Sequence, residues 1–106
     1  MTEITVHELN KRLKGGEKIT LIDVREPFEY EMANIGGKLI PLGSIALTLP
    51  SLSQYKDSEV VVYCRSGARS STACAFLRTA GFQKIRNLTG GILAWKNEID
   101  PNLNVQ

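Results

Sequence analysis

The chain has few of the residues that build metal sites or attract polyanions. Its 106 residues include two cysteines and one histidine, and the spacing of Cys64, Cys74 and His7 does not match that of metal ligands, so we expect no metal site. The net charge is also small, because lysine and arginine exceed aspartate and glutamate by only 13 − 11 = 2. This balance gives no reason to expect nucleic acid or an anionic membrane as a partner.

Long apolar runs are missing as well. No stretch has the length that a membrane helix needs, and the polar N-terminus lacks the apolar core of a secretory signal. These absences favour a cytoplasmic protein, in which thiols stay reduced. A disulfide between Cys64 and Cys74 is therefore not expected, particularly because a helix is predicted to separate them.

The residues that are present fit one globular domain over 1–106. The composition is 42% hydrophobic and 23% charged, which is ordinary for a globular protein. The predicted helices cover 6–14, 27–32, 70–80 and a segment after 91, with shorter helical pieces in 44–55. The predicted strands cover 19–23, 39–40, 59–64 and 84–88. Strands alternate with helices, which predicts an α/β fold with a mainly parallel sheet and right-handed crossovers.

The stretch VVVYCRSGARSSTACAFL, residues 60–77, ends an apolar run on Cys64. Ligands of parallel α/β sheets bind beyond the carboxyl ends of the strands, where this cysteine lies. A short loop between that strand and the next helix can point several backbone N–H groups at one anion, and Gly67 lets the backbone curl there. Arg65 and Arg69 add positive charge. Together these features predict that Cys64 is held as a thiolate.

Each of these features also has an ordinary explanation. A cysteine at the end of a buried strand can simply fill space in the core, and two arginines can form a solvated rim. The combination with a glycine, several hydroxyl groups and the strand–loop–helix context favours a reactive thiol over packing.

Three motifs resemble signatures of the single-domain rhodaneses. They are LIDVREPFEYE, CRSGARSSTACAFLRTAGF and LTGGILAWK, in the order and spacing of that family, and together they span essentially the whole chain. The resemblance implies a rhodanese-like fold: a central, mainly parallel five-stranded sheet flanked by helices on both faces. It also implies a sulfurtransferase that needs no metal or organic cofactor.

In that resemblance Cys64 matches the catalytic nucleophile. It would take a sulfane sulfur from an anionic donor such as thiosulfate, hold it as a persulfide, and pass it to cyanide, a thiol or a protein acceptor. The loop that would bind the donor consists of Arg65, Ser66, Gly67, Ala68 and Arg69. The supporting residues would be Asp23, Arg25 and Ser70, with a salt bridge between Asp23 and Arg25 that positions the loop. We expect the protein to act as a monomer.

One segment departs from the family pattern. Many rhodaneses carry a GHIPGA-like sequence after the first motif, whereas this chain has ANIGGKLIPLG, with Asn34 in place of the histidine and Gly36 in place of the proline. We expect this difference to affect substrate specificity more than the basic activity.

Residues of the two later helices are expected mainly in the core. Cys74 is interpreted as a small buried packing residue, with a resolving thiol as the alternative. Phe76 and Trp95 are also interpreted as core residues, and His7 as a surface residue of the first helix.

Two other functions share parts of the same pattern. Phosphatases and arsenate reductases place five residues between cysteine and arginine, whereas four separate Cys64 from Arg69, and the shorter loop suits a sulfane sulfur better than a phosphate. A non-catalytic rhodanese-like binding module is the other alternative, although inactive members often lack the cysteine.

Overall fold

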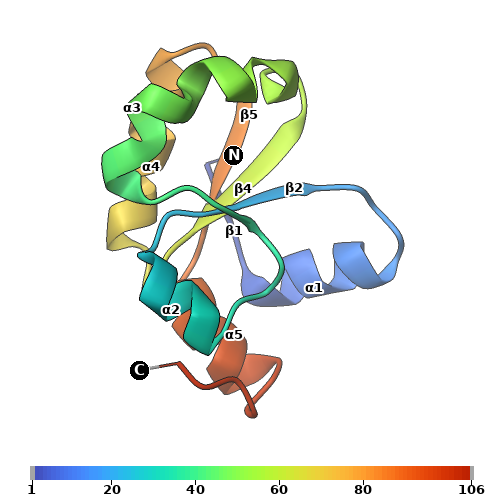
Figure 1. Cartoon of the computed structure of the whole chain (residues 1–106). Coiled ribbons are helices and arrows are strands. Elements are labelled where there is room, and N and C mark those ends of the chain that lie inside the picture. Colours follow the sequence, from blue (N-terminus) through green and yellow to red (C-terminus); the bar gives the residue numbers. More distant parts are fainter. Residues whose placement is uncertain (1, 106) are drawn as a thin grey trace.

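The computed structural model describes residues 2–105. The strands are β1 (Glu3–Ile4), β2 (Thr20–Asp23), β3 (Lys38–Leu39), β4 (Glu59–Tyr63) and β5 (Lys84–Leu88). The helices are α1 (Val6–Lys14), α2 (Pro27–Met32), α3 (Ile45–Thr48), α4 (Ala68–Thr79) and α5 (Gly91–Glu98), with 3₁₀ helices η1 (Leu42–Ser44) and η2 (Leu49–Tyr55) around α3 (Figure 1). Among the described residues, no helix is long and apolar enough to cross a membrane.

The strands form one sheet in the order β1-β5-β4-β2-β3, and every neighbouring pair is parallel. β4 lies at the centre, between β5 and β2. This arrangement confirms the predicted α/β fold with a parallel five-stranded sheet.

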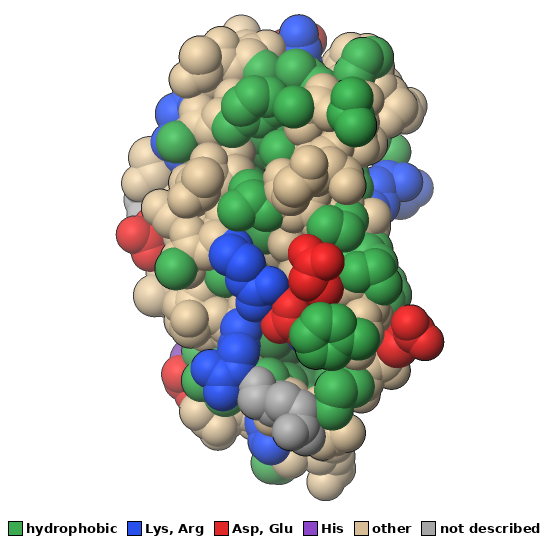
Figure 2. All heavy atoms as spheres, turned by 60° about the vertical axis from the view of Figure 1, so that its left-hand side comes forward, with side chains coloured by type: hydrophobic (Ala, Val, Ile, Leu, Met, Phe, Trp, Pro, Cys, Tyr) green, Lys and Arg blue, Asp and Glu red, His purple; other side chains and the backbone are tan. Residues whose placement is uncertain are grey.

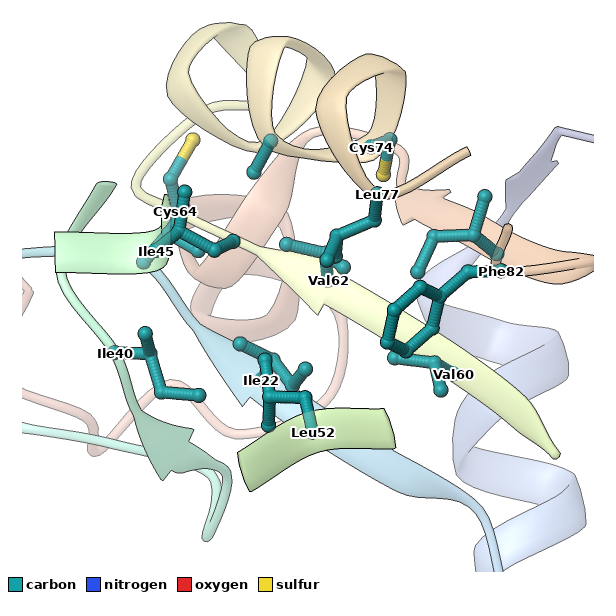
Figure 3. Close-up of a cluster of buried hydrophobic side chains, with 13 residues drawn as sticks. Ile22, Ile40, Ile45, Leu52, Val60, Val62, Cys64, Cys74, Leu77 and Phe82 are labelled. Carbon is teal, nitrogen blue, oxygen red and sulfur yellow. The ribbon is translucent and has the colours of Figure 1, made fainter. Parts of the chain in front are cut away.

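Two hydrophobic clusters cover the two faces of the sheet. On one face, side chains from α3, η2 and α4 pack on alternate residues of the strands, and Figure 3 shows this cluster around Val60 and Val62. On the other face, α1 and α5 pack on Val61 and Tyr63. The four β4 residues from Val60 to Tyr63 have no exposed surface. Burial on both faces explains why β4 is a continuous apolar run rather than an alternating one.

The first helix forms as the sequence predicts. Thr5 caps α1, because its Oγ1 accepts a hydrogen bond of 3.1 Å from the backbone N–H of Glu8. The chain leaves the helix at Gly15, and Gly16 follows with a φ of 86°. His7 is exposed, as expected, and its ring lies 2.8 Å from Glu98 of α5.

Apart from one-residue shifts at the ends of elements, three features differ from the sequence predictions. β1 was not predicted; it is two residues long and pairs with the end of β5. α4 begins at Ala68 rather than at residue 70, because Gly67, with a φ of 116°, lets the chain turn directly into the helix. The assignment of Phe76 to the core is wrong, since the side chain is 37% exposed on the outer side of α4, whereas Trp95 is buried as predicted.

Candidate active site

The candidate site is built around Cys64, the residue that follows central strand β4. Its side chain is 2% exposed, and Figure 3 shows it beside the helix α4 that follows in the chain. The carboxyl end of the central strand, the loop 65–67 and the start of α4 therefore meet at this sulfur. This is the edge at which parallel α/β sheets bind ligands.

Hydrogen-bond donors converge on Cys64 Sγ. The backbone N–H of Gly67 lies 3.1 Å from the sulfur and the hydroxyl of Ser70 lies 3.3 Å from it. Burial by itself would raise the pKa of the thiol, but the Ser70 hydroxyl and the backbone N–H groups of Ser70, Gly67 and Ser66 outweigh burial, so the pKa lies below its ordinary value. The ring of N–H groups that the sequence predicted is present, and it favours the thiolate.

Helix α5 also holds the cysteine loop. Two backbone N–H groups in its first turn donate to carbonyls of Cys64 and the loop, from Ile92 to Cys64 (2.9 Å) and from Leu93 to Arg65 (3.0 Å). Gly91 permits this close approach, because a Cβ there would lie 2.5 Å from both carbonyl oxygens. The GGILAW motif therefore contributes to the site by holding the backbone of Cys64 and Arg65.

Asp23 and Arg25 form a buried ion pair at the end of β2. Their side chains are 0% and 3% exposed, and Arg25 Nη2 lies 2.7 Å from Asp23 Oδ2. Arg25 also donates to the backbone carbonyl of Ala33 (2.7 Å), and Asp23 accepts from the Arg25 backbone (2.9 Å). The pair joins the end of β2 to the end of α2. The predicted salt bridge is therefore present, and its role in positioning the cysteine loop stays a prediction.

The sequence-predicted loop residue Arg69 makes a contact that was not anticipated. Its guanidinium forms a bidentate ion pair with Glu29 of α2, with N–O distances of 2.7 and 2.9 Å. Arg69 holds the pKa of that carboxyl at about 2, well below its ordinary value. The positive charge of Arg69 is therefore largely balanced by Glu29. In the structure this ion pair connects α4 to α2.

Other predicted loop residues lie at the surface. Ser66 and Ala68 are exposed on either side of Gly67. Arg65 is also exposed and lines a cavity of about 120 Å³ that is otherwise formed by Arg25, Phe28, Glu29, Met32, Asn104 and Val105. Figure 2 shows the face that carries α2 and α4, where basic and acidic side chains lie next to one another among apolar ones. The exposed apolar side chains of α2 are Phe28 (65%) and Met32 (39%).

The segment that departs from the family pattern forms its own hydrogen bonds. Asn34 Oδ1 accepts from the backbone N–H of Gly36 (2.9 Å), and Asn34 Nδ2 donates to the carbonyl of Tyr30 (3.2 Å). Gly36 has a φ of 90°, a conformation that proline cannot adopt. Gly37 follows and packs so tightly on buried Tyr63 that a Cβ would lie 2.8 Å from its ring. In this chain residues 34–37 form a turn that is held by Tyr30 on one side and by Tyr63 on the other.

One residue that contacts the neighbours of the sulfur, Asn87 of β5, was not predicted from the sequence. Its Oδ1 lies 2.6 Å from the Ser70 hydroxyl, and its Nδ2 donates to the carbonyl of Gly67 (3.1 Å). Asn87 stands directly before the LTGG motif, but a single asparagine in a strand carries no signal by itself. Its role depends on strand pairing that brings residue 87 beside residues 67 and 70.

The second cysteine lies in the same hydrophobic cluster. Cys74 projects from α4 farther along the helix than the sulfur of Cys64 (Figure 3), and both cysteines are free thiols. Burial raises the pKa of Cys74 to about 11. Among residues 2–105 there is no group of three or more histidine, cysteine or acidic side chains that could hold a metal ion.

Known proteins that resemble this chain share one type of domain. The sequence profile of the rhodanese-like domain matches residues 5–98. A protein from Allochromatium vinosum named "Sulfurtransferase" is 41% identical over 96 residues, covering 90% of this chain and 88% of that protein. The "Probable adenylyltransferase/sulfurtransferase MoeZ" of Mycobacterium tuberculosis is 39% identical over 101 residues, covering 94% of this chain but 26% of that longer protein.

A solved structure agrees with the sequence matches. The crystal structure of a rhodanese-like domain protein from Staphylococcus aureus superposes with a TM-score of 0.83 at 30% identity, covering 100% of this chain and 99% of that one. The sequence profile spans nearly all of the described residues, and the three motifs lie in the elements that surround Cys64. The chain belongs to the rhodanese-like domain family.

Proposed function

We propose that this protein is a sulfurtransferase that carries a sulfane sulfur as a persulfide on Cys64. The observation that supports this most directly is the buried Cys64 sulfur, which receives hydrogen bonds from Gly67 and Ser70 at the carboxyl end of the central strand. The proposal agrees with the printed name of the Allochromatium vinosum relative, which covers most of this chain.

In the first half-reaction the Cys64 thiolate attacks the outer sulfur of thiosulfate. A new S–S bond forms to Sγ, the S–S bond of thiosulfate breaks, and sulfite leaves with the electron pair of that bond. In the second half-reaction a nucleophile such as cyanide attacks the outer sulfur of the persulfide, the Sγ–S bond breaks, and the thiolate returns. Each half-reaction ends before the other begins, so we expect ping-pong kinetics.

The hydrogen-bond donors that favour the Cys64 thiolate can stabilise the sulfur in both half-reactions. Cys64 Sγ is negatively charged before attack and again as it leaves the persulfide, so the Gly67 N–H at 3.1 Å stabilises the reacting sulfur at both stages. The nearby surface supplies Arg65 at the rim of a cavity, while Arg69 is paired with Glu29. An anionic donor therefore meets a site with modest rather than strong positive charge.

The loop length argues against phosphatase chemistry. Four residues separate Cys64 from Arg69, and the Arg69 guanidinium is turned to Glu29. A phosphatase site needs that guanidinium to hold phosphate oxygens. We therefore expect negligible hydrolysis of aryl phosphates by the unmodified protein.

Mass spectrometry of the intact protein tests the proposal. After incubation with thiosulfate and removal of small molecules, the protein should gain the mass of one sulfur atom, and cyanide should remove it with formation of thiocyanate. The Cys74→Ser variant should behave in the same way, and Cys64→Ser should gain no sulfur. If the unmodified, folded protein gains no sulfur from thiosulfate or from an organic persulfide donor, the proposed sulfur transfer is wrong.

A further inference from the structure

We propose that Asn87 is a positioning residue that competes with Cys64 for the single hydroxyl proton of Ser70. The inference rests on the proposed role of Cys64 as the reacting thiol, but it concerns the state of that thiol before any sulfur donor is present. Asn87 lies on β5, outside the cysteine loop, and contacts Gly67 and Ser70, which both donate to the sulfur.

The strand register fixes the position of Asn87. It pairs with Val62 of β4 on one side and with Glu3 of β1 on the other. Its backbone N–H donates to the carbonyl of Thr2 (2.9 Å). The side chain projects to the same face of the sheet as Ile85, two residues earlier, which packs in the cluster that includes α4. Asn87 is thus held beneath the start of α4 by two neighbouring strands.

The orientation of the Asn87 amide follows from its two contacts. Nδ2 lies 3.1 Å from the carbonyl oxygen of Gly67, which can only accept a hydrogen bond. The NH₂ group must therefore face Gly67, and Oδ1 must face the Ser70 hydroxyl, 2.6 Å away. A flipped amide would place two acceptors against each other at Gly67.

The Ser70 hydroxyl then has two acceptors for one proton. It lies 2.6 Å from Asn87 Oδ1 and 3.3 Å from Cys64 Sγ, and Ser70 is fully buried. When Cys64 is a thiol, its S–H can donate to Ser70 Oγ while the Ser70 proton goes to Asn87. When Cys64 loses its proton to solvent, Ser70 must turn its proton to the thiolate, and Asn87 Oδ1 loses its donor.

Asn87 therefore favours the thiol relative to the thiolate. Removing its side chain leaves the Ser70 proton with one acceptor, the sulfur, so the thiolate becomes easier to form. The loop keeps most of its anchoring, because the Gly67 carbonyl also accepts from the backbone N–H of Ser71 (3.0 Å) and Gly67 remains the residue that caps α4.

Charged and titratable groups surround this chain of contacts and stay the same in the variants below. On the loop side they are Arg65, the Arg69–Glu29 pair and the Asp23–Arg25 pair. On the other side, Asn87 shares a pocket of about 130 Å³ with Thr2, Glu3, Ser71, Cys74 and Arg78. A change in the titration of Cys64 that depends on Ser70 therefore cannot arise from a change in these groups.

The test is the pH dependence of Cys64 alkylation by iodoacetamide, with no sulfur donor and with the modified peptide identified by mass spectrometry. Asn87→Ala and Asn87→Val should both lower the Cys64 pKa by about 0.5–1 unit, a three- to tenfold rise in the thiolate-to-thiol ratio, as expected for one neutral hydrogen bond. Asn87→Val keeps a residue that suits a strand, in case alanine prevents folding.

The Ser70→Ala background provides the matched control. Without the hydroxyl, the same two Asn87 substitutions should no longer lower the Cys64 pKa, because there is no proton to release. A merely structural role for Asn87 would loosen the Gly67 N–H and raise the pKa. A raised or unchanged pKa after the Asn87 substitutions, or equal lowering with and without Ser70, would overturn the inference.

A measurement on the unmodified protein does not depend on any variant folding. The side-chain carbonyl carbon of Asn87 should shift in an NMR titration with the same midpoint as Cys64, and a flat response would contradict the inference. Both experiments omit sulfur donors. Failure of sulfur transfer therefore leaves their outcome intact, and failure of this inference leaves the proposed function intact.

Discussion

The two cysteines of this protein lie in one hydrophobic cluster and have opposite tendencies to ionise. Both side chains are 2% exposed, so burial alone would raise the pKa of each. Hydrogen-bond donors lower the pKa of Cys64 below its ordinary value, whereas among residues 2–105 no hydrogen bond offsets the burial of Cys74, which raises its pKa to about 11. The supply of donors, rather than exposure, separates the two thiols.

The difference originates in the backbone on either side of each residue. Cys64 follows a strand, where the chain turns through Gly67 and can point its N–H groups back at the sulfur. Cys74 lies inside α4, where backbone N–H groups are used by the carbonyls of the preceding turn. A helix interior cannot offer free donors to a side chain, but a loop that leads into a helix can.

The largest effect that would test this comparison is the selectivity of alkylation. At pH 7 a thiol with the pKa of Cys74 is ionised to the order of one part in ten thousand, so it should remain unmodified while Cys64 reacts with iodoacetamide. Peptide mapping of the native protein should find the label on Cys64. Label on Cys74 at a comparable rate would show that hydrogen bonding does not separate the two thiols.

Mutation of Gly91 should damage the environment of Cys64 and leave that of Cys74 intact. Gly91→Ala places a Cβ 2.5 Å from the carbonyl oxygens of Cys64 and Arg65, at a φ of 61°. The left-handed conformation alone costs about 1–2 kcal/mol, and the contact adds to it. We expect a loss of more than about 2 kcal/mol in the free energy of unfolding, measured by urea titration with circular dichroism, and a higher Cys64 pKa.

Gly16→Ala is the matched control for that substitution. Gly16 has a φ of 86°, and no atom would lie within 4 Å of an added Cβ. Gly16→Ala should lower the free energy of unfolding only by the cost of the left-handed backbone conformation, about 1–2 kcal/mol. The Cys64 pKa should not change. Equal losses in both variants, with no change at Cys64, would mean that the approach of α5 does not support the loop.

The sequence predicted the parts of this site that are encoded by neighbouring residues. The apolar run before Cys64 indicated a buried strand, and the turn at Gly67 indicated a ring of N–H groups around the sulfur; the structure has both. The Asp23–Arg25 salt bridge, which the resemblance to the rhodaneses implied, is also present. Local chemistry was enough to predict the strand and the turn.

The features that the sequence did not predict depend on distant residues. β1 is two residues long and exists because it pairs with β5, more than eighty residues later. Glu29 meets Arg69 forty residues away in the chain, and Asn87 meets Ser70 seventeen residues away. Neither partner has a pattern of its own, so their roles follow only from the order of the strands. The exposure of Phe76 was misjudged because an aromatic residue in α4 can face either side of the helix.

The charge of Arg69 should have a small effect on the reaction with thiosulfate. Because Glu29 balances that charge and both side chains are partly exposed, Arg69→Ala should lower kcat/KM for thiosulfate by up to about fivefold, the range of an exposed charge interaction. A neutral sulfur donor should be affected less. Glu29→Gln should act in the opposite direction and raise kcat/KM for thiosulfate, since it leaves Arg69 unbalanced. Equal losses with both donors in Arg69→Ala would show that Arg69 holds the loop rather than attracting the donor.

The smallest effect concerns stability in acid, where the Glu29–Arg69 ion pair on the Cys64 side should be lost. The folded-state pKa of Glu29 is about 2, below its ordinary 4.5, so the pair stabilises the folded protein fully above about pH 4.5, and this contribution disappears as the pH falls toward 2. Glutamine at position 29 can still accept the hydrogen bond from the Glu26 backbone N–H at the start of α2.

The Glu29→Gln variant should unfold more easily than the unmodified protein near pH 6. The expected loss is about 0.2–1 kcal/mol in the free energy of unfolding, because Arg69 is 36% exposed. The difference should close near pH 2. Glu59, whose pKa Arg12 also lowers, is present in both proteins, so its titration cancels in the comparison. Urea titrations at a series of pH values measure the difference, and a difference that persists unchanged at pH 2 would mean that Glu29 stabilises the fold through packing and not through its charge.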